Sequence, residues 1–193
     1  MLQIGLTGGI GSGKSTIAKV LEKMGYPVFY ADLEAKKIYH EDPVLKENLI
    51  QIIGQEVFVN GQLNTKLLAE KLFSNTQLKD HVAALVHPIV REAFVSWVKL
   101  QKASLVFNEA AILFETGAYQ NFDANLLVVA PAQLRIERVI KRDALNEDQV
   151  QARIAQQWSD EQKMKLTPYL IHNDGRPLLV QIEKLVNELQ SKQ

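Results

Sequence analysis

The sequence contains no cysteine, which excludes a disulfide framework and thiolate chemistry at a metal or redox site. It also lacks an excess of charge, because 22 basic residues balance 22 acidic ones. No net field therefore attracts nucleic acid or an anionic membrane, and neither is an expected partner. No apolar run approaches the roughly 20 residues that span a bilayer, and the N-terminus lacks a basic signal segment. We therefore expect a soluble, cytoplasmic globular protein.

The first thirty residues predict a strand, a helix and a second strand. Residues 2–7 form an apolar run that ends in glycines, and residues 15–24 carry apolar side chains at helical spacing up to Gly25. A β-rich run follows at residues 26–30. A right-handed crossover between parallel strands is the strong default for this order, which indicates an α/β protein.

The rest of the chain predicts a helical insertion and then more strands. Residues 33–102 are mostly helical in pattern, with a tight turn at Asn60-Gly61 and a helix that Pro88 should kink or break. Strand patterns return at residues 105–107, 125–130 and 170–172. A basic helical hairpin is predicted between the last two of these strands, with a capping box formed by Asn146 and Gln149.

The segment from Gly8 to Ser15 carries the clearest chemical signal. It reads glycine, four residues, glycine, lysine, serine, and it lies between the first predicted strand and helix. Such a phosphate loop wraps a phosphate with backbone N–H groups, and the helix behind it adds partial positive charge. Lys14 would contact the β- and γ-phosphates of a nucleotide, and the Ser15 hydroxyl would bind Mg²⁺. A glycine-rich turn without a ligand is the alternative, which the flanking strand and helix disfavour.

The phosphate loop alone does not separate kinases from GTPases, motors or transporters. The sequence has no Asn-Lys-x-Asp segment for reading guanine, and it is short for a helicase or transporter module. Small-molecule kinases add a helical substrate lobe after the second strand and an arginine-bearing lid late in the chain, and both patterns are present. A nucleotide-dependent switch that hydrolyses ATP slowly is the rival from another functional class.

Asp32 follows the second predicted strand, where a carboxylate would point into the crevice in which such folds bind ligands. It could accept a proton from a substrate hydroxyl. Aspartate is also a good N-cap, so Asp32 could merely begin the next helix. The residues themselves leave these alternatives evenly balanced.

Arg138, Arg142 and Arg153 also have two interpretations. They could lie on a solvated helical face, which is the usual role of a charge run. With a phosphate loop upstream, they could instead form a lid whose cations neutralise charge during phosphoryl transfer. A lone histidine in a helical segment, such as His87 before Pro88, is more often a packing or capping residue than a catalyst.

Taken together, the motifs resemble dephospho-CoA kinases along nearly the whole chain. The matching stretches are Ile4–Thr16, Ala31–Ile38, His87-Pro88, Ile112–Glu115, Arg138–Asp143, Arg153-Ile154 with Gln157, and Tyr169–Gly175. The resemblance implies transfer of the γ-phosphate of ATP to the ribose 3′-hydroxyl of dephospho-CoA, with Mg²⁺ as cofactor. A nucleoside or nucleotide kinase with the same core is the alternative among enzymes.

The resemblance also implies site residues. The ATP phosphates would be held by Gly11, Ser12, Gly13, Lys14, Ser15 and Thr16. Asp32 would be the base near the 3′-hydroxyl, Arg138 and Arg142 would be lid arginines, and Asn173 would lie beside the adenine of ATP. The acceptor would lie near His87, Leu113 and Glu115.

The fold that follows is a three-layer α/β phosphate-loop kinase with a mainly parallel sheet of about five strands. We expect residues 1–31, 86–134 and 164–193 to form the nucleotide-binding core, 32–85 the helical acceptor lobe and 135–163 the lid. A monomer or weak homo-oligomer is expected.

Two segments of the sequence depart from the family pattern. Glu109 and Ala111 stand where the family often has aspartate and proline, so the role of Glu109 at a metal or water is an open question. Thr167-Pro168 replaces a common Ala-Asp pair before the last strand.

Overall fold

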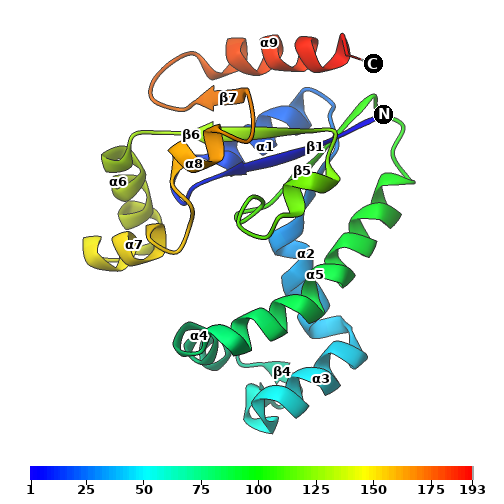
Figure 1. Ribbon diagram of the computed structural model, residues 1–193, viewed down its shortest axis with the longest axis vertical. Coiled ribbons are helices and arrows are strands. Elements are labelled where there is room, and N and C mark those ends of the chain that lie inside the picture. The colour runs from blue at the N-terminus through cyan, green and yellow to red at the C-terminus, as the bar shows by residue number, and fades with distance from the viewer. Residues whose placement is uncertain (193) are drawn as a thin grey trace. The chain divides into compact units, whose positions relative to one another are not determined.

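The computed structural model describes residues 1–192, which form two compact units (Figure 1). One unit consists of Met1–Tyr30 and the chain from Gln101 onward, and the other consists of Ala31–Leu100. The sequence analysis places the end of the helical lobe at residue 85, whereas the second unit continues to Leu100. Each helix within residues 1–192 is too short or too polar to cross a membrane.

The first unit is built on a five-stranded sheet in which every pairing is parallel. Its strands are β1 (Leu2–Gly8), β2 (Val28–Tyr30), β5 (Leu105–Glu109), β6 (Ala124–Val129) and β7 (Tyr169–His172), in the order β2-β5-β1-β6-β7. The central strand β1 pairs Leu6 with Glu109 on one side and Gly8 with Val128 on the other. The predicted parallel α/β sheet is therefore confirmed.

Helices of the first unit are α1 (Lys14–Lys23), α6 (Ala132–Asp143), α7 (Glu147–Ile154), α8 (Asp160–Met164) and α9 (Leu178–Gln190), with a 3₁₀ turn η2 (Ala118–Asn121). Successive residues of β6 point to opposite faces of the sheet. Leu126 and Val128 pack in the core that includes residues of α1 and α9, whereas Leu127 and Val129 pack with Phe114 in a separate cluster. Both faces are covered, as the apolar runs of the strands require.

Side-chain hydrogen bonds fix the starts of two elements in this unit, α7 and β7. The capping box at the start of α7 is confirmed, because Asn146 and Gln149 bond each other's backbone N–H groups. The Thr167 hydroxyl donates to the backbone oxygen of Asn125 and accepts from the Tyr169 N–H at 3.2 Å. Thr167 thus fixes the entry to β7.

The second unit is helical, with one small hairpin. It contains α2 (Ala31–Glu41), α3 (Pro43–Ile53), η1 (Gln55–Val57), β3 (Phe58–Val59), β4 (Gln62–Leu63), α4 (Thr65–Ser74) and α5 (Thr76–Val98). Its own apolar core includes Leu45, Leu49 and Val82. Asn60 and Gly61 both have positive φ, 52° and 78°, as a tight two-residue hairpin turn requires. The predicted turn is confirmed.

Of the two effects predicted for Pro88, a kink or a break, the break does not occur, because α5 continues through this residue; the kink stays a prediction. An interior proline costs about 3 kcal/mol, but the buried side chains of Val82, Val86 and Phe94 lie on both sides of it and each contributes about 1.5–3 kcal/mol. Of the two roles considered for Asp32, the N-cap is excluded, because α2 begins at Ala31, directly after β2, and Asp32 lies in its first turn.

Candidate active site

The phosphate loop connects β1 to α1, as its motif predicts. Gly11 and Gly13 have φ values of 78° and 93°, which favour glycine because other residues are strained there. Gly13 directly precedes α1, and no side chain caps that helix end. The first N–H groups of a helix lack intrahelical partners, so this end of α1 is suited to bind an anion.

Glu109 lies beside Lys14 and Ser15, the two loop residues that are expected to contact the nucleotide and Mg²⁺. The Lys14 ammonium is 2.5 Å from Glu109 Oε1, and the Ser15 hydroxyl donates to the same oxygen at 3.3 Å. Glu109 is the last residue of β5, the strand next to β1, and is only 4% exposed. Glu109, which stands where the family often has aspartate, therefore contacts both the lysine and the serine of the loop through its carboxylate.

Arg138 and Asn173 also meet at the loop, although they come from α6 and from the residue after β7. The Asn173 amide donates to the backbone oxygen of Ser12 at 2.8 Å. Arg138 donates to the backbone oxygens of Gly11 at 3.4 Å and Asn173 at 3.2 Å. A Cβ atom on Gly13 would lie 2.1 Å from Asn173 Nδ2, so only glycine allows this approach.

Arg142, one helical turn further along α6, has different partners. Its guanidinium binds Asp143 with two hydrogen bonds of 2.7 and 2.9 Å, and its side chain is 62% exposed. Arg153 also approaches Asp143, at 3.6 Å. The hydrogen bond from Arg142 holds the pKa of Asp143 below its usual value. The structure thus brings Arg138, but not Arg142, to the phosphate loop.

The residues expected near the acceptor lie in both units. Leu113 is 2% exposed, and a Cβ on Gly5 would meet its side chain at 2.5 Å. Glu115 pairs with the buried Lys163 at 2.8 Å and accepts the Trp158 N–H at 3.0 Å. Asp32 in α2 and the exposed His87 in α5 belong to the second unit.

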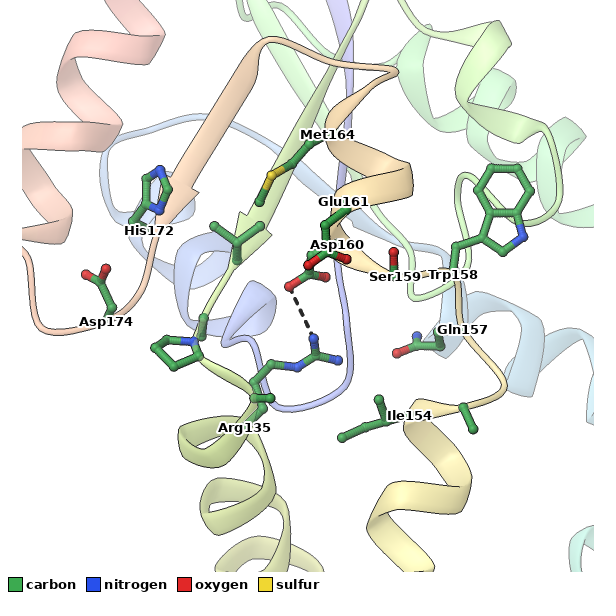
Figure 2. A pocket seen from close by; sticks show the side chains of 15 residues that line it. Arg135, Ile154, Gln157, Trp158, Ser159, Asp160, Glu161, Met164, His172 and Asp174 are labelled. Carbon is green, nitrogen blue, oxygen red and sulfur yellow. Dashed lines mark hydrogen bonds and ion pairs between the residues drawn. The ribbon is translucent and has the colours of Figure 1, made fainter.

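Arg135 and Gln157 also contact the loop, and sequence reasoning gave neither a role in the site. Arg135 was interpreted only as part of a basic helix, but it is 7% exposed and lies against Ile10. Arg135, Gln157 and Asp160 line a cavity of about 590 Å³ next to α6 and α8 (Figure 2). The only sequence signal for Gln157 is the spacing that resembles dephospho-CoA kinases.

Comparisons with known proteins identify the family. The dephospho-CoA kinase family matches residues 2–178 of this chain. A dephospho-CoA kinase of Bacteroides fragilis is 41% identical, with 99% of this chain and 94% of that protein covered.

Two solved structures have the same fold over nearly the whole chain. One, from Thermus thermophilus, has a TM-score of 0.87 and 34% identity, with 99% of this chain and 97% of the other covered. A dephospho-CoA kinase from Campylobacter jejuni has a TM-score of 0.70 and 25% identity, with 98% of each chain covered. The fold, the phosphate loop with its converging side chains and these matches agree: the chain belongs to the dephospho-CoA kinase family.

Proposed function

We propose that the protein transfers the γ-phosphate of ATP to the ribose 3′-hydroxyl of dephospho-CoA, which yields CoA and ADP in the last step of coenzyme A synthesis. The hydroxyl oxygen attacks the γ-phosphorus, the bond from that phosphorus to the β,γ-bridging oxygen breaks, and the hydroxyl proton goes to a base. One observation carries the proposal: Glu109, Arg138 and Asn173 converge on a phosphate loop in a chain of this family.

The loop would hold the triphosphate mainly by position and charge. Backbone N–H groups from Gly11 to Thr16 would surround the phosphates, and the N-terminal end of α1 would add partial positive charge. Lys14 would move its ammonium from Glu109 toward the β- and γ-phosphates. Asn173 would lie beside the adenine, which is supported by its bond to the Ser12 backbone oxygen.

The residues at the start of α1 suit Mg²⁺, which prefers hydroxyl, carboxylate and phosphate oxygens. Ser15 and Glu109 would hold the ion together with oxygens of the bound nucleotide, because their side-chain oxygens already lie 3.3 Å apart. Among residues 1–192 there is no cluster of three histidine or acidic side chains that could hold a metal by itself. The bound ion would neutralise charge on the β- and γ-phosphates.

The residues proposed for the acceptor are those that the family resemblance implies. Asp32 would accept the hydroxyl proton, and His87, Leu113 and Glu115 would lie near dephospho-CoA. Residues 135–163 would form the lid, with Arg138 and Arg142 as its cations. We also propose that the reaction takes place in the cytoplasm, with which a chain without cysteine is compatible.

The proposed function is tested by measuring ADP release with a panel of acceptors. Fast turnover is expected with dephospho-CoA, and turnover at least about 10²-fold slower, which is roughly what an apolar pocket alone achieves between close analogues, with nucleosides and nucleoside monophosphates. Preference for a nucleoside or its monophosphate would instead assign the chain to nucleotide metabolism. Slow ATP hydrolysis that no acceptor accelerates would identify a nucleotide-dependent switch.

The two lid arginines are expected to differ in importance. Arg138→Ala removes a cation that already lies at the phosphate loop, so it should lower turnover about 10- to 100-fold, the value of one charge-assisted hydrogen bond. The KM for dephospho-CoA should change little, because the lid acts mainly in the transition state. Arg142→Ala should also lower turnover, but only if lid closure frees Arg142 from Asp143.

Steady-state kinetics of both variants, with Lys141→Ala on the same helix as a surface control, measures these effects. If Arg138→Ala and Arg142→Ala both keep wild-type turnover, the hairpin is a solvated surface and the lid assignment is wrong.

A further inference from the structure

The backbone of Ile10, in the phosphate loop, is bound at both its N–H and its C=O, which belong to two consecutive peptide groups. Gln157 Oε1 accepts the Ile10 N–H at 2.7 Å. Arg135 Nε donates to the Ile10 backbone oxygen at 2.9 Å. Neither partner belongs to the β1–α1 segment, since Arg135 lies in α6 and Gln157 lies between α7 and α8. The loop is therefore held from outside by residues more than 100 positions away.

Each of these two side chains is itself fixed by another contact. The second end of the Gln157 amide donates to the backbone oxygen of Ala111, just after β5, at 3.1 Å. Arg135 Nη1 is 3.2 Å from Asp160 Oδ2, and this ion pair lies in the wall of the cavity (Figure 2). The Arg135 side chain is 9% exposed, and a buried cation remains charged at low cost only when it is paired and hydrogen-bonded.

Two glycines of the loop allow its close contact with Arg135. A Cβ on Gly9 would lie 2.1 Å from Arg135 Nη2, and a Cβ on Gly11 would lie 2.4 Å from the Arg135 backbone oxygen. Both distances are too short for a real side chain. These glycines thus let the loop pack on α6, in addition to leaving its N–H groups free for phosphates.

We propose that Arg135 and Gln157 are positioning residues that hold the peptide groups on either side of Ile10 and thereby set the conformation of the phosphate loop, with Asp160 orienting Arg135. The inference rests on the proposed use of this loop to bind ATP. A loop held in its binding shape loses less conformational freedom when the nucleotide binds. Without these contacts, the nucleotide itself must order the loop, and its affinity falls.

The cleanest test is Gln157→Leu, because it removes both hydrogen bonds of the side-chain amide without changing a charge. Gln156→Leu, an identical change at the exposed neighbouring residue, is the matched control. We expect Gln157→Leu to raise the ADP Kd, measured by titration calorimetry, and the KM for ATP by about 10-fold, as expected when a buried N–H loses its partner. The KM for dephospho-CoA should stay within about twofold, and Gln156→Leu should behave as the wild type.

Arg135 provides an independent test if Gln157→Leu does not fold. Arg135→Lys keeps the positive charge but has a single nitrogen in place of the two that bind Ile10 and Asp160, whereas Arg135→Met keeps only the apolar stem. We expect Arg135→Met to weaken ADP binding by about 10-fold and Arg135→Lys to restore part of it. Arg135→Met should also reduce the further effect of Gln157→Leu, because both side chains act on the backbone of one residue.

The outcomes separate this inference from the proposed function. If the wild-type protein binds ADP and the Gln157→Leu and Arg135→Met variants bind it equally well, the positioning role is refuted and the proposed function stands. If affinity for ADP and dephospho-CoA falls equally in a folded variant, the contacts only support the general fold, which also refutes the inference. A wild-type protein that does not bind ADP would refute the use of the loop itself.

Discussion

Replacing Lys14 with alanine is expected to lower turnover by about 10³-fold or more, the lower end of the effect of a cation on a transferring phosphoryl group. Lys14 is the first residue of α1, and its ammonium lies beside Glu109 at the C-terminal end of β5. Arg138, another cation at the loop, donates to the backbone oxygens of Gly11 and Asn173. We therefore do not expect it to replace the lost charge of Lys14.

The stability of Lys14→Ala must be measured alongside its turnover. The change leaves the buried Glu109 carboxylate without its lysine, and breaking a buried ion pair is destabilising. We expect a lower melting temperature but a folded protein, because the Ser15 hydroxyl still donates to Glu109. Assays should be run well below the melting temperature of the variant.

Lys19→Ala is the matched control, since Lys19 lies on the same helix and is exposed. It should leave turnover and ATP affinity unchanged. A folded Lys14→Ala enzyme with turnover close to that of the wild type would reject the phosphate-loop assignment, whatever the resemblance of the sequence.

The fold could be predicted where short-range rules determine it. The apolar run before the glycines became β1, and the Asn60-Gly61 pair became a hairpin turn because both residues adopt positive φ. A break at Pro88, one of the two predicted effects, does not occur because the local cost of the proline is outweighed by the burial of residues such as Val86 and Phe94. Such packing comes from tertiary structure, and a local pattern does not contain it.

The candidate site could likewise be predicted only where its residues are close together in the sequence. The phosphate loop was predictable because its residues are contiguous and their spacing carries the mechanism. Glu109, Arg135 and Gln157 reach the loop from about 100 residues or more away, so only the folded chain shows their contacts. The pairing of Arg142 with its neighbour Asp143 also emerged only from side-chain geometry.

The Asp32→Asn variant is expected to lose about 10²- to 10⁴-fold in turnover, the usual contribution of a general base. Asparagine keeps the size and shape of the side chain but cannot accept the hydroxyl proton. Because Asp32 lies in the first turn of α2, its charge also interacts favourably with the helix dipole, by about 0.3–1 kcal/mol. That effect predicts a melting temperature lower by only a few degrees for a chain of this size.

Glu34→Gln makes the same change of acid to amide in the same helical turn, so it controls for the lost charge. It should lower stability about as much as Asp32→Asn but leave turnover unchanged. ATP affinity should be nearly preserved in both variants, because the base is proposed to contact the acceptor and not the triphosphate. The measurement is turnover at saturating ATP and dephospho-CoA, beside the melting temperature. If Asp32→Asn stays within about threefold of the wild type, well short of the ~10² expected for a base, Asp32 contributes only to the start of α2 and the proton must go elsewhere.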